Sequence, residues 1–552
     1  MQSNREISRL FKLYAELLKV HGKDIPLAEA LSTAAYRVTN LDMEVEFMND
    51  KEVAATFPKM VIPVIHELKN TRDIAAVDEL VELTPQGIFE IMRIKGLGGT
   101  KIRELWYALD IDSIDALLDA CKKGEVSKLR GFGAKTVKNI INEIDTYHGN
   151  ETRFHYASVA DAANKLVKAL QQLLGSKLIS LCGEARRQAT TVEAIEIITD
   201  VQAVKFNNDG LKKLLIVQST NKELTKAFTH DEIPVTIYHV PKTEFYDELF
   251  RRTGNEEHVR KVLEKATISG KAPSETAIYR RAKLPYIIPE MREDVAEWNF
   301  KGKEKDLIKV SDITGVVHNH TTWSDGVDDL AKFARTCKYR QFEYTVISDH
   351  SKNAHYAGGL KEEEVLQQMQ EIDELNKQMK PFKIFKSIEC DIRVSGELDY
   401  EDSFLKLFDL VIISVHQQLK MDEQKATARL IRAIENPYTT ILGHMTGRQL
   451  LIRPGYPLNF KKVIDTCAAN KVVIEMNANP YRLDMDWSHI PYALDKGVMI
   501  SINPDAHSTK EIDNIKWGVS AARKGGLTKS MTWNAMPLQK IEAWLTSKKR
   551  GR

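Results

Sequence analysis

The chain has 552 residues, of which 43% are hydrophobic and 28% are charged, and its formal net charge is +2. This length is too great for one hydrophobic core, so we expect roughly three or four domains. No apolar run approaches the ~20 residues of a membrane span, and the small net charge excludes a bulk positive field that could attract nucleic acid.

The five cysteines are scattered and include no Cys-x-x-Cys pair. This pattern argues for a reducing compartment and against a disulfide framework or a thiolate zinc site. The first residues, "MQSNREISRLFKLY", contain no apolar region of the signal-peptide type. We therefore expect a cytoplasmic protein without membrane contact.

Two segments in the first third share one pattern. "IKGLGGTKIRELW" (94–106) and "LRGFGAKTVKNII" (129–141) both read apolar-x-Gly-apolar-Gly, followed by a basic residue and an amphipathic helix. The glycines allow a tight hairpin, and the next helix presents unpaired N–H groups to an anion. This is the helix-hairpin-helix pattern, which binds DNA phosphates without reading bases. The predicted DNA-binding residues are Gly96, Gly98, Lys101, Gly131, Gly133 and Lys135.

One Gly-x-Gly before a helix is usually only a turn, whereas two copies, each followed by a lysine, favour DNA binding. Residues 91–148 contain ten Lys or Arg against eight Asp or Glu. The predicted contact with DNA is therefore local and modest.

Residues 1 to about 300 resemble a bacterial family X DNA polymerase. The matching pieces are the two hairpins, "CGEARRQATTVEAIEII", "FYDELFRRTGNEEH" and "YIIPEMRED". The resemblance implies a helical lyase-like domain over 1–80 and a helix-hairpin-helix domain over 81–150. It also implies an α+β nucleotidyltransferase-like palm over 151–240 and a thumb-like region with a linker over 241–300.

The palm departs from the family pattern at its metal-binding carboxylates. The family's Asp-x-Asp reads Ala194-Ile195-Glu196 here, and the third aspartate corresponds to Thr236. Nucleotidyl transfer needs these carboxylates to hold two magnesium ions against the phosphates. A shifted alignment would instead make Glu193, Glu196 and Asp200 the site, but a strand directs Glu193 and Glu196 to opposite faces.

The nucleotide-binding loop and the lyase site depart as well. Arg186 and Arg187 match the family's arginine pair, but its Gly-Ser reads Gly183-Glu184, which places a negative charge where triphosphate should bind. The segment "ATFPKMVIPVIHEL" lacks the expected Gly-x-Gly, and the lyase lysine corresponds to Val64. We predict that polymerase and lyase activities are lost.

After Gly315, apolar runs rich in Val and Ile recur, and most end in a potential metal ligand. Examples are "GVVHNH", "YTVISDH", "FKIFKSIE", "DLVIISVH", "YTTILGH", "KVVIEMN" and "GVMISINPDAH". Stretches with helical periodicity separate them, which predicts a parallel sheet covered by helices. Seven strands with functional groups at their carboxyl ends are typical of a closed β/α barrel.

Nine ligand-type residues are predicted to converge at this edge: His318, His320, Asp325, His350, Glu389, His416, His444, Asp505 and His507. Each histidine alone is more often a core or surface residue than a ligand. Together, six imidazoles and three carboxylates exceed one tetrahedral ion, so two or three divalent ions are expected. Nitrogen and oxygen ligands without sulfur favour zinc, manganese or iron over calcium or magnesium alone. Clustered divalent ions of this kind favour phosphoester hydrolysis.

Residues 315–552 resemble the PHP (polymerase and histidinol phosphatase) domain, through "HNHTTWSDG", "SDHS", "IECDI", "SVH", "LGHMTGR", "MNANPYRLD" and "PDAHS". The resemblance implies a PHP domain over 301–552, a distorted seven-stranded β/α barrel with a trinuclear centre. Its first ion would be held by His318, His320, Glu389 and Asp505, and its second by Glu389, His416 and His444. The third ion would be held by Asp325, His350 and His507.

By the same resemblance, Glu389, Asp325 and His350 are the expected catalytic residues. Arg448 and Arg482 are candidates for binding substrate phosphate; a surface or capping role is an equal alternative for each.

The whole sequence predicts a cytoplasmic, monomeric 3'-5' exonuclease or 3'-end processing enzyme in DNA repair. It would act on gapped, nicked or 3'-ended DNA, with its polymerase half retained as a scaffold. The alternatives are an active polymerase with an appended nuclease, a non-catalytic DNA-end adaptor and a small-molecule phosphatase.

Overall fold

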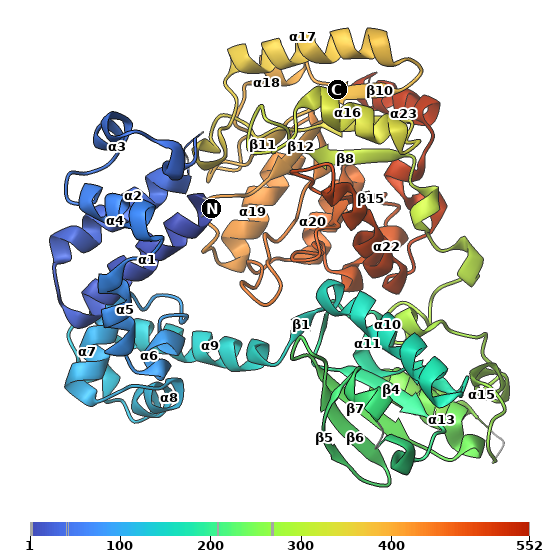
Figure 1. The fold of residues 1–552 in the computed structure, drawn as a ribbon. Coiled ribbons are helices and arrows are strands. Elements are labelled where there is room, and N and C mark those ends of the chain that lie inside the picture. The colour runs from blue at the N-terminus through green and yellow to red at the C-terminus, as the bar shows by residue number, and fades with distance from the viewer. Residues whose placement is uncertain (1–3, 40, 42, 207–208, 267–269, 551–552) are drawn as a thin grey trace. The chain divides into compact units, whose positions relative to one another are not determined.

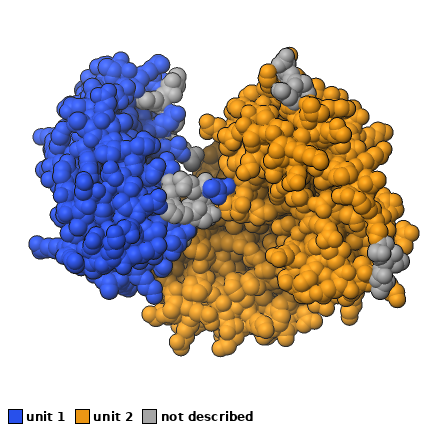
Figure 2. Space-filling model, turned by 90° about the horizontal axis from the view of Figure 1, so that it is seen from below, with its two compact units in different colours: residues 1–152 blue, residues 153–552 orange. Residues whose placement is uncertain are grey.

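The computed structural model describes residues 4–39, 41, 43–206, 209–266 and 270–550. The chain divides into two compact units, residues 1–152 and residues 153–552 (Figure 2). The first unit is helical, and the second combines helices with strands (Figure 1). This confirms the predicted multidomain fold with a helical N-terminal part and an α/β C-terminal part. None of the described helices is long and apolar enough to cross a membrane.

The helices of the first unit enclose two hydrophobic cores. They are α1 (Asn4–His21), α2 (Ile25–Thr39), α3 (Asp50–Thr56), α4 (Ile62–Thr71), α5 (Ala75–Glu82), α6 (Gln86–Ile91), α7 (Gly99–Leu109), α8 (Ile114–Lys122) and α9 (Ala134–Glu151). Apolar residues of α1 recur every three or four positions, as at Ile7, Phe11 and Leu18, and face the first core. The second core, built mainly from α6 to α9, includes Ile102 and Phe132.

The second unit begins with a mixed sheet whose strand order is β2-β4-β7-β6-β5. Its strands are β2 (Ile179–Leu181), β4 (Ile195–Thr199), β5 (Ile216–Thr220), β6 (Leu224–Phe228) and β7 (Pro234–His239), and a short ribbon pairs β1 (Phe154–His155) with β3 (Thr191–Val192). Along β4, Ile195 and Ile197 face one core and Ile198 faces another, because side chains alternate along a strand. Both faces of the sheet are therefore covered at β4, whereas β5 at the sheet edge is exposed.

Six α-helices among the described residues belong to this part of the unit; some pack on the sheet, and others follow it in the chain. They are α10 (Tyr156–Leu174), α11 (Gly183–Arg187), α12 (Asp209–Lys212), α13 (Phe245–Thr253), α14 (Glu256–Lys265) and α15 (Glu275–Arg281). The side chains of Phe245 and Leu249 in α13 join Ile198 in the smaller core, whereas Leu170 in α10 joins the larger one.

The rest of the second unit contains two parallel sheets. Their strands are β8 (Gly315–Asn319), β9 (Tyr344–Ile347), β10 (Lys383–Lys386), β11 (Glu389–Asp391), β12 (Val411–Ser414), β13 (Thr439–Leu442), β14 (Val473–Asn477) and β15 (Ile500–Asn503). The order is β10-β9-β8 in one sheet and β11-β12-β13-β14-β15 in the other. Isolated bridges pair His350 with Glu389 and Asn319 with Ala506, so each end of the larger sheet adjoins the smaller one.

The predicted alternation of buried strands with helices is found here, with one difference. The run "FKIFKSIE" was expected to form one strand, but most of it forms β10 and its last residue, Glu389, begins β11, because β10 pairs with β9 whereas β11 pairs with β12. The intervening helices are α16 (Leu330–Tyr339), α17 (Glu362–Met379), α18 (Asp402–Leu405), α19 (Glu423–Ile434), α20 (Phe460–Ala469), α21 (Ile490–Asp495), α22 (Ile515–Lys524) and α23 (Leu538–Arg550).

Candidate metal centre and nucleic-acid contacts

The structure brings the nine predicted ligand residues together at the carboxyl ends of the parallel strands. Their ligand atoms form four overlapping groups, and within each group the atoms lie within 4.8 Å of one another. The groups are His320–Asp325–His350–His507, His318–Glu389–His444, His318–His320–Asp505 and His350–Glu389–His416. Because four of these residues belong to two groups each, neighbouring ions could share ligands.

Glu389 lies at the middle of the cluster and is 1% exposed. Its Oε1 is 2.9 Å from Nε2 of His444 and 3.2 Å from Nε2 of both His318 and His416. Its Oε2 is 3.0 Å from Nδ1 of His350. One carboxylate thus contacts imidazoles from the carboxyl ends of four different strands, β8, β9, β12 and β13, as a bridging ligand would.

Several buried polar atoms in the cluster have no hydrogen-bond partner among the described residues. They include Nε2 of His318, both ring nitrogens of His320 and both carboxylate oxygens of Glu389. A buried polar group left unsatisfied costs about 1–3 kcal/mol. Coordination to divalent cations would satisfy these atoms, and a nitrogen and oxygen donor set suits Zn²⁺, Mn²⁺ or Fe²⁺. The residues present therefore fit a metal centre.

Two further carboxylates orient the imidazoles and were not among the predicted site residues. Oε2 of Glu475 lies 2.5 Å from Nδ1 of His318, and Oδ1 of Asp391 lies 2.5 Å from Nδ1 of His416. Each contact leaves Nε2 of the histidine directed at Glu389. Such second carboxylates fix the tautomer of a metal-binding histidine. The sequence signal was available, because Asp391 follows Glu389 by two positions on the same strand.

The carboxylates also set the charge of the histidines around them. Burial favours the neutral imidazole, but Glu389 and Asp325 outweigh it and raise the pKa of His350 to about 10. Asp325 likewise outweighs burial at His507 and raises its pKa to about 9. Burial, together with the two neighbouring imidazoles, lowers the pKa of His320 to about 3. Divalent ions bound here would displace the protons that the carboxylates attract.

Two of the nine residues have unusual backbone conformations. His318 has φ of 64° and Asp505 has φ of 51°, in the left-handed region that residues other than glycine seldom adopt. The register of β8 against β9 also shifts between Val316 and Asn319. In a regular strand, residues two positions apart point to the same side; here His318 and His320 are brought together by a local irregularity instead. Backbone strain of this kind occurs at functional sites.

The two candidate phosphate-binding arginines have different surroundings. Arg448 donates from Nε to the carbonyl oxygen of Arg482 at 2.9 Å and from Nη1 to Asp486 at 2.6 Å. It therefore joins two loops. Arg482 is half-buried, and its Nε lies 3.8 Å from Oδ2 of Asp505, beside the cluster. Phosphate binding by either residue stays a prediction, and Arg482 is the better placed.

The two glycine hairpins of the first unit lie where the sequence predicted. Gly96 has φ of 89° and Gly131 has φ of 86°, and each precedes the start of a helix, α7 or α9. A Cβ atom at Gly96, Gly131 or Gly133 would meet nothing within 4 Å, so these turns are open to a ligand.

The hairpins differ in what surrounds their helix N-termini. In the first, Gly99 donates its backbone N–H to Glu16 at 2.6 Å, and Lys101 donates to the carbonyl oxygen of Gly96 at 3.1 Å. A carboxylate thus holds a position that a DNA phosphate could take. In the second hairpin, Lys135 is exposed.

Two of the positions predicted to carry the palm carboxylates are adjacent in the structure. Glu196 in β4 pairs directly with Thr236 in the parallel strand β7, and Ala194 lies just before β4. Glu196 accepts a hydrogen bond from Tyr238 at 3.0 Å, and burial raises its pKa. Gly183 has φ of 60°, and a Cβ atom there would lie 1.7 Å from Oε2 of Glu196.

The cationic groups of the nucleotide-binding loop are bonded within the protein. Arg186 donates to both oxygens of Glu275, at 3.0 and 2.6 Å, and Arg187 donates to Glu293 at 3.1 Å. The buried Lys524 of α22 also donates to Glu293, at 2.6 Å. This α11 segment therefore joins the palm to its neighbours.

Glu184 and Val64, which stands at the predicted lyase position, also make contacts within the protein. Glu184 accepts from Arg153 at 2.7 Å. Val64, at the position of the lyase lysine, is buried in the first core.

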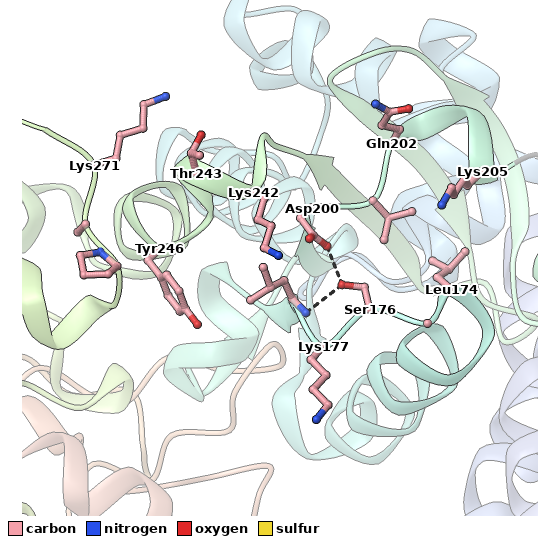
Figure 3. A pocket seen from close by; sticks show the side chains of 15 residues that line it. Leu174, Ser176, Lys177, Asp200, Gln202, Lys205, Lys242, Thr243, Tyr246 and Lys271 are labelled. Carbon is pink, nitrogen blue, oxygen red and sulfur yellow. Dashed lines mark hydrogen bonds between the residues drawn. The ribbon is translucent and has the colours of Figure 1, made fainter.

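A cavity of about 1150 Å³ lies between the ends of β2, β4 and β7 and the start of α13. Its polar lining includes Ser176, Lys177, Asp200, Lys242 and Lys271, and Ser176 donates to Asp200 at 2.6 Å. Figure 3 shows Lys242 extending toward Asp200, whereas Lys177 and Lys271 extend away. None of the nine metal-type residues lines this cavity.

Comparison with protein families identifies one domain. The family model described as a SAM-like helix-hairpin-helix tandem matches residues 88–146. This range contains both glycine hairpins, so the predicted helix-hairpin-helix domain is confirmed.

Comparison with curated proteins finds similarity over the whole chain and over its C-terminal part. A Bacillus subtilis (strain 168) protein named DNA polymerase/3'-5' exonuclease PolX is 30% identical over 98% of this chain and 99% of its own length. A probable phosphatase of Thermoanaerobacter sp. (strain X514) is 26% identical over 42% of this chain and 94% of its own length. A probable phosphatase of Caldanaerobacter subterraneus subsp. tengcongensis is 22% identical over 42% of this chain and 91% of its own length. The phosphatases match the C-terminal part.

Proposed function

This chain belongs to the PolX family of DNA polymerase/3'-5' exonucleases, and from this membership we propose that it is a metal-dependent phosphoesterase that processes DNA 3' ends in repair. The observation that carries the proposal is the convergence of nine ligand-type residues around Glu389. Its substrates would be gapped, nicked or 3'-ended DNA. It would act as a cytoplasmic monomer with two or three divalent ions, either Mn²⁺, Zn²⁺ or Fe²⁺, with Mg²⁺ as a further candidate.

The domain assignment extends this proposal. The helical lyase-like domain would span 1–80, the helix-hairpin-helix domain 81–150, the palm 151–240, the thumb-like region 241–300 and the PHP domain 301–552. Two separate cores in the first unit support the first boundary. A distorted PHP barrel is supported by the adjoining of the two parallel sheets at both ends of the larger one.

The proposed hydrolysis uses residues in distinct roles. Bound divalent ions would lower the pKa of a water molecule and neutralise charge on the phosphate. Glu389, almost fully buried, would hold the centre together from its middle. Asp325 is about a third exposed and lies 3.5 Å from Nε2 of His350, so these two residues would face the entering substrate. Arg482 would orient a phosphate with its planar guanidinium.

We also infer that the palm does not catalyse nucleotide addition. Ala194 and Thr236 offer no charged ligand for magnesium, and the half-buried side chain of Glu196 lies against Gly183. Arg186, which would bind triphosphate in an active relative, is paired with Glu275. The α11 segment would serve to position the DNA-processing half instead.

One experiment tests both parts of the proposal. The full chain is incubated with Mn²⁺ and a primer-template labelled at the primer 5' end, with and without deoxynucleoside triphosphates. We expect shortening of the primer under both conditions. No change in length would contradict the exonuclease proposal.

The inactive palm is tested in the Glu389→Ala variant, so that digestion cannot hide synthesis. Mg²⁺ and Mn²⁺ are supplied separately. Template-directed extension would contradict the inferred loss of polymerase activity. It would favour an active polymerase, an activity that the name of the Bacillus subtilis relative includes.

A small-molecule phosphatase is the second candidate, because two relatives of the C-terminal part are named probable phosphatases. Hydrolysis of a phosphate monoester by the full chain, without any shortening of DNA, would favour that activity. The helix-hairpin-helix tandem favours DNA.

A further inference from the structure

Exposed aromatic side chains are rare in the C-terminal part of the second unit. Among the described residues from 301 to 550, the tyrosines with exposed side chains are Tyr339, Tyr356 and Tyr481, at 89%, 51% and 54%. Tyr356 contacts two of the ligand histidines, and Tyr481 immediately precedes Arg482, which lies beside Asp505. Single exposed rings are common on protein surfaces, so what matters is where Tyr356 and Tyr481 lie and not their exposure alone.

Tyr356 lies against the imidazoles of the centre. It occupies a short 3-10 turn, His355–Ala357, and its ring centroid lies 6.2 Å from that of His350 and 6.4 Å from that of His416. These separations fall within the range of aromatic contacts. One part of the ring therefore touches the ligand histidines, and the rest faces solvent.

Tyr481 lies at the same rim through its neighbour Arg482, whose Nε is 3.8 Å from Asp505. The backbone of Tyr481 is anchored on both sides, because its N–H donates to Asn479 at 3.0 Å and its carbonyl accepts from Leu450 at 2.7 Å. The ring is thus exposed but held on a fixed backbone.

His155, in the predicted palm, contacts the ring of Tyr481. The imidazole of His155 in β1 lies edge-on to Tyr481, with ring centroids 4.8 Å apart. Nε2 of His155 is also 3.0 Å from the carbonyl oxygen of Leu450. The same palm residue therefore contacts both loops that hold Tyr481.

We propose that Tyr356, Arg482 and Tyr481 form a nucleotide-binding rim for the 3'-terminal nucleotides of single-stranded DNA. This proposal rests on the proposed exonuclease function and names how its substrate is held. The two phenol rings stack on unpaired bases, and Arg482 binds the phosphate between them and the metal centre. Stacking on exposed aromatic rings is how proteins hold single strands without reading their sequence. His155 positions Tyr481 and thereby makes the palm part of the substrate site.

The first test measures binding in the cleavage-deficient Glu389→Ala background, with a labelled single strand of about five nucleotides, near the lower limit of such sites. We expect Tyr356→Ala and Tyr481→Ala each to raise Kd about tenfold, as for loss of one stacked base. Tyr→Phe at either position should retain affinity, because the ring remains. Tyr339→Ala is the matched control: its ring is exposed, but it ends α16, before β9 and away from the carboxyl ends of the strands. Unchanged Kd in both alanine variants would overturn the proposal.

The second test separates stacking from a structural role. Steady-state hydrolysis of the oligonucleotide is compared with hydrolysis of a small chromogenic phosphate diester by the cleavage-competent full chain. The alanine variants should lose about tenfold more on the oligonucleotide than on the diester, mainly through KM. Equal losses on both substrates would overturn the proposal. His155→Ala should also reduce hydrolysis of the oligonucleotide more than hydrolysis of the diester, but by less than Tyr481→Ala does.

A substrate change completes the test as a double-mutant cycle. An oligonucleotide whose 3'-terminal positions are abasic should bind the parent chain more weakly, yet bind the Tyr356→Ala, Tyr481→Ala double variant with little further loss. Additive losses would contradict stacking. If the unmodified chain hydrolyses no DNA, the proposed function fails, whereas the rim is still judged by these binding constants.

Discussion

The predicted palm and the candidate metal centre both gather charged side chains, but they differ in whether those side chains have hydrogen-bond partners within the protein. In the palm, Arg186 is bonded to Glu275 and Arg187 to Glu293. In the metal centre, Nε2 of His318 and both oxygens of Glu389 have no hydrogen-bond partner among the described residues. Since each unsatisfied buried group destabilises the fold by about 1–3 kcal/mol, such groups are retained where a ligand completes them.

This difference gives a criterion that family resemblance alone does not supply. Both regions carry residues that match an enzyme family, yet only the metal centre leaves donor atoms directed at a common point. In the palm the matching arginines stabilise the fold. Hydrogen-bond satisfaction thus separates a site poised for a ligand from one whose residues now hold the structure together.

The largest effect is expected from a substitution in the candidate metal centre. Glu389→Ala should abolish DNA hydrolysis, with a loss well beyond the roughly 10²–10³-fold cost of removing a single electrostatic stabiliser, because Glu389 contacts four imidazoles. The measurement is the rate of primer shortening together with bound metal per chain. Glu374→Ala, an exposed glutamate paired with Lys377, is the control. Retained activity with unchanged metal content would show that the centre is assigned wrongly.

The next effect concerns the palm and should appear in stability. Glu275→Gln leaves Arg292, which is fully buried, without its carboxylate partner. Removing one partner of a buried ion pair costs about 3–5 kcal/mol, so the free energy of unfolding should fall by about that amount in urea denaturation. Glu264→Gln, which removes an exposed partner of Arg260, should cost at most about 0.5 kcal/mol. A neutral Glu275→Gln would mean that the palm pairs do not hold the fold.

The same residue gives a pH dependence. Burial alone would raise the pKa of Glu275, but Arg186 and Arg292 outweigh it and lower the pKa below its ordinary value. The stability from this carboxylate is therefore fully present above the ordinary glutamate pKa of about 4.3. It is lost as the pH falls through the lowered folded-state pKa. The stability difference between the parent chain and Glu275→Gln should shrink over that acidic interval.

Most of the candidate site could be predicted from the sequence because its residues lie at the carboxyl ends of apolar strands. The nine ligand residues lie in or just after six of the seven apolar runs, and parallel strands bring such ends to one edge. The split between β10 and β11 was not predictable, because Ser387 and Ile388 contain no glycine or proline turn signal and the break depends on which strand pairs with each part. The positive φ of His318 and Asp505 had no signal either, since neither residue is glycine.

The roles of the arginines also needed the structure. Arg448 and Arg482 are equivalent in the sequence, as basic residues shortly after a strand end. Only the fold shows that Arg448 ties two loops together through Asp486, whereas Arg482 lies beside Asp505. The orienting role of Glu475 likewise depends on contact with His318, which is 157 positions away.

Glu475 offers a smaller effect at the metal centre. Glu475→Gln keeps the shape of the side chain but weakens its contact with Nδ1 of His318. Removing an orienting carboxylate typically costs about 10–100-fold in metal affinity. Metal titration of the apo protein should show this shift, and DNA hydrolysis should recover at higher metal concentration. Failure of added metal to restore hydrolysis would mean that Glu475 acts on folding instead of on the ligand.

The smallest effect compares the two glycine hairpins. The N-terminus of α9 carries an exposed Lys135, whereas at α7 the N–H of Gly99 is bonded to Glu16 and Lys101 is bonded to Gly96. Lys135→Ala should therefore weaken duplex DNA binding more than Lys101→Ala does. The loss should be at most about fivefold, since an exposed ion pair contributes up to about 1 kcal/mol. It should also reduce the slope of log affinity against log salt by about 1, as expected for one phosphate contact.

The measurement is fluorescence anisotropy at several salt concentrations in the Glu389→Ala background, with Lys377→Ala as an exposed-lysine control. Glu16→Gln sharpens the comparison, because a neutral amide at the α7 N-terminus removes the charge that competes with phosphate. If Glu16 blocks the first hairpin, Glu16→Gln should strengthen binding and make Lys101→Ala as costly as Lys135→Ala. Equal effects of the two lysines in the parent chain would mean that phosphate displaces Glu16 freely. The internal contact at α7 would then have no bearing on DNA binding.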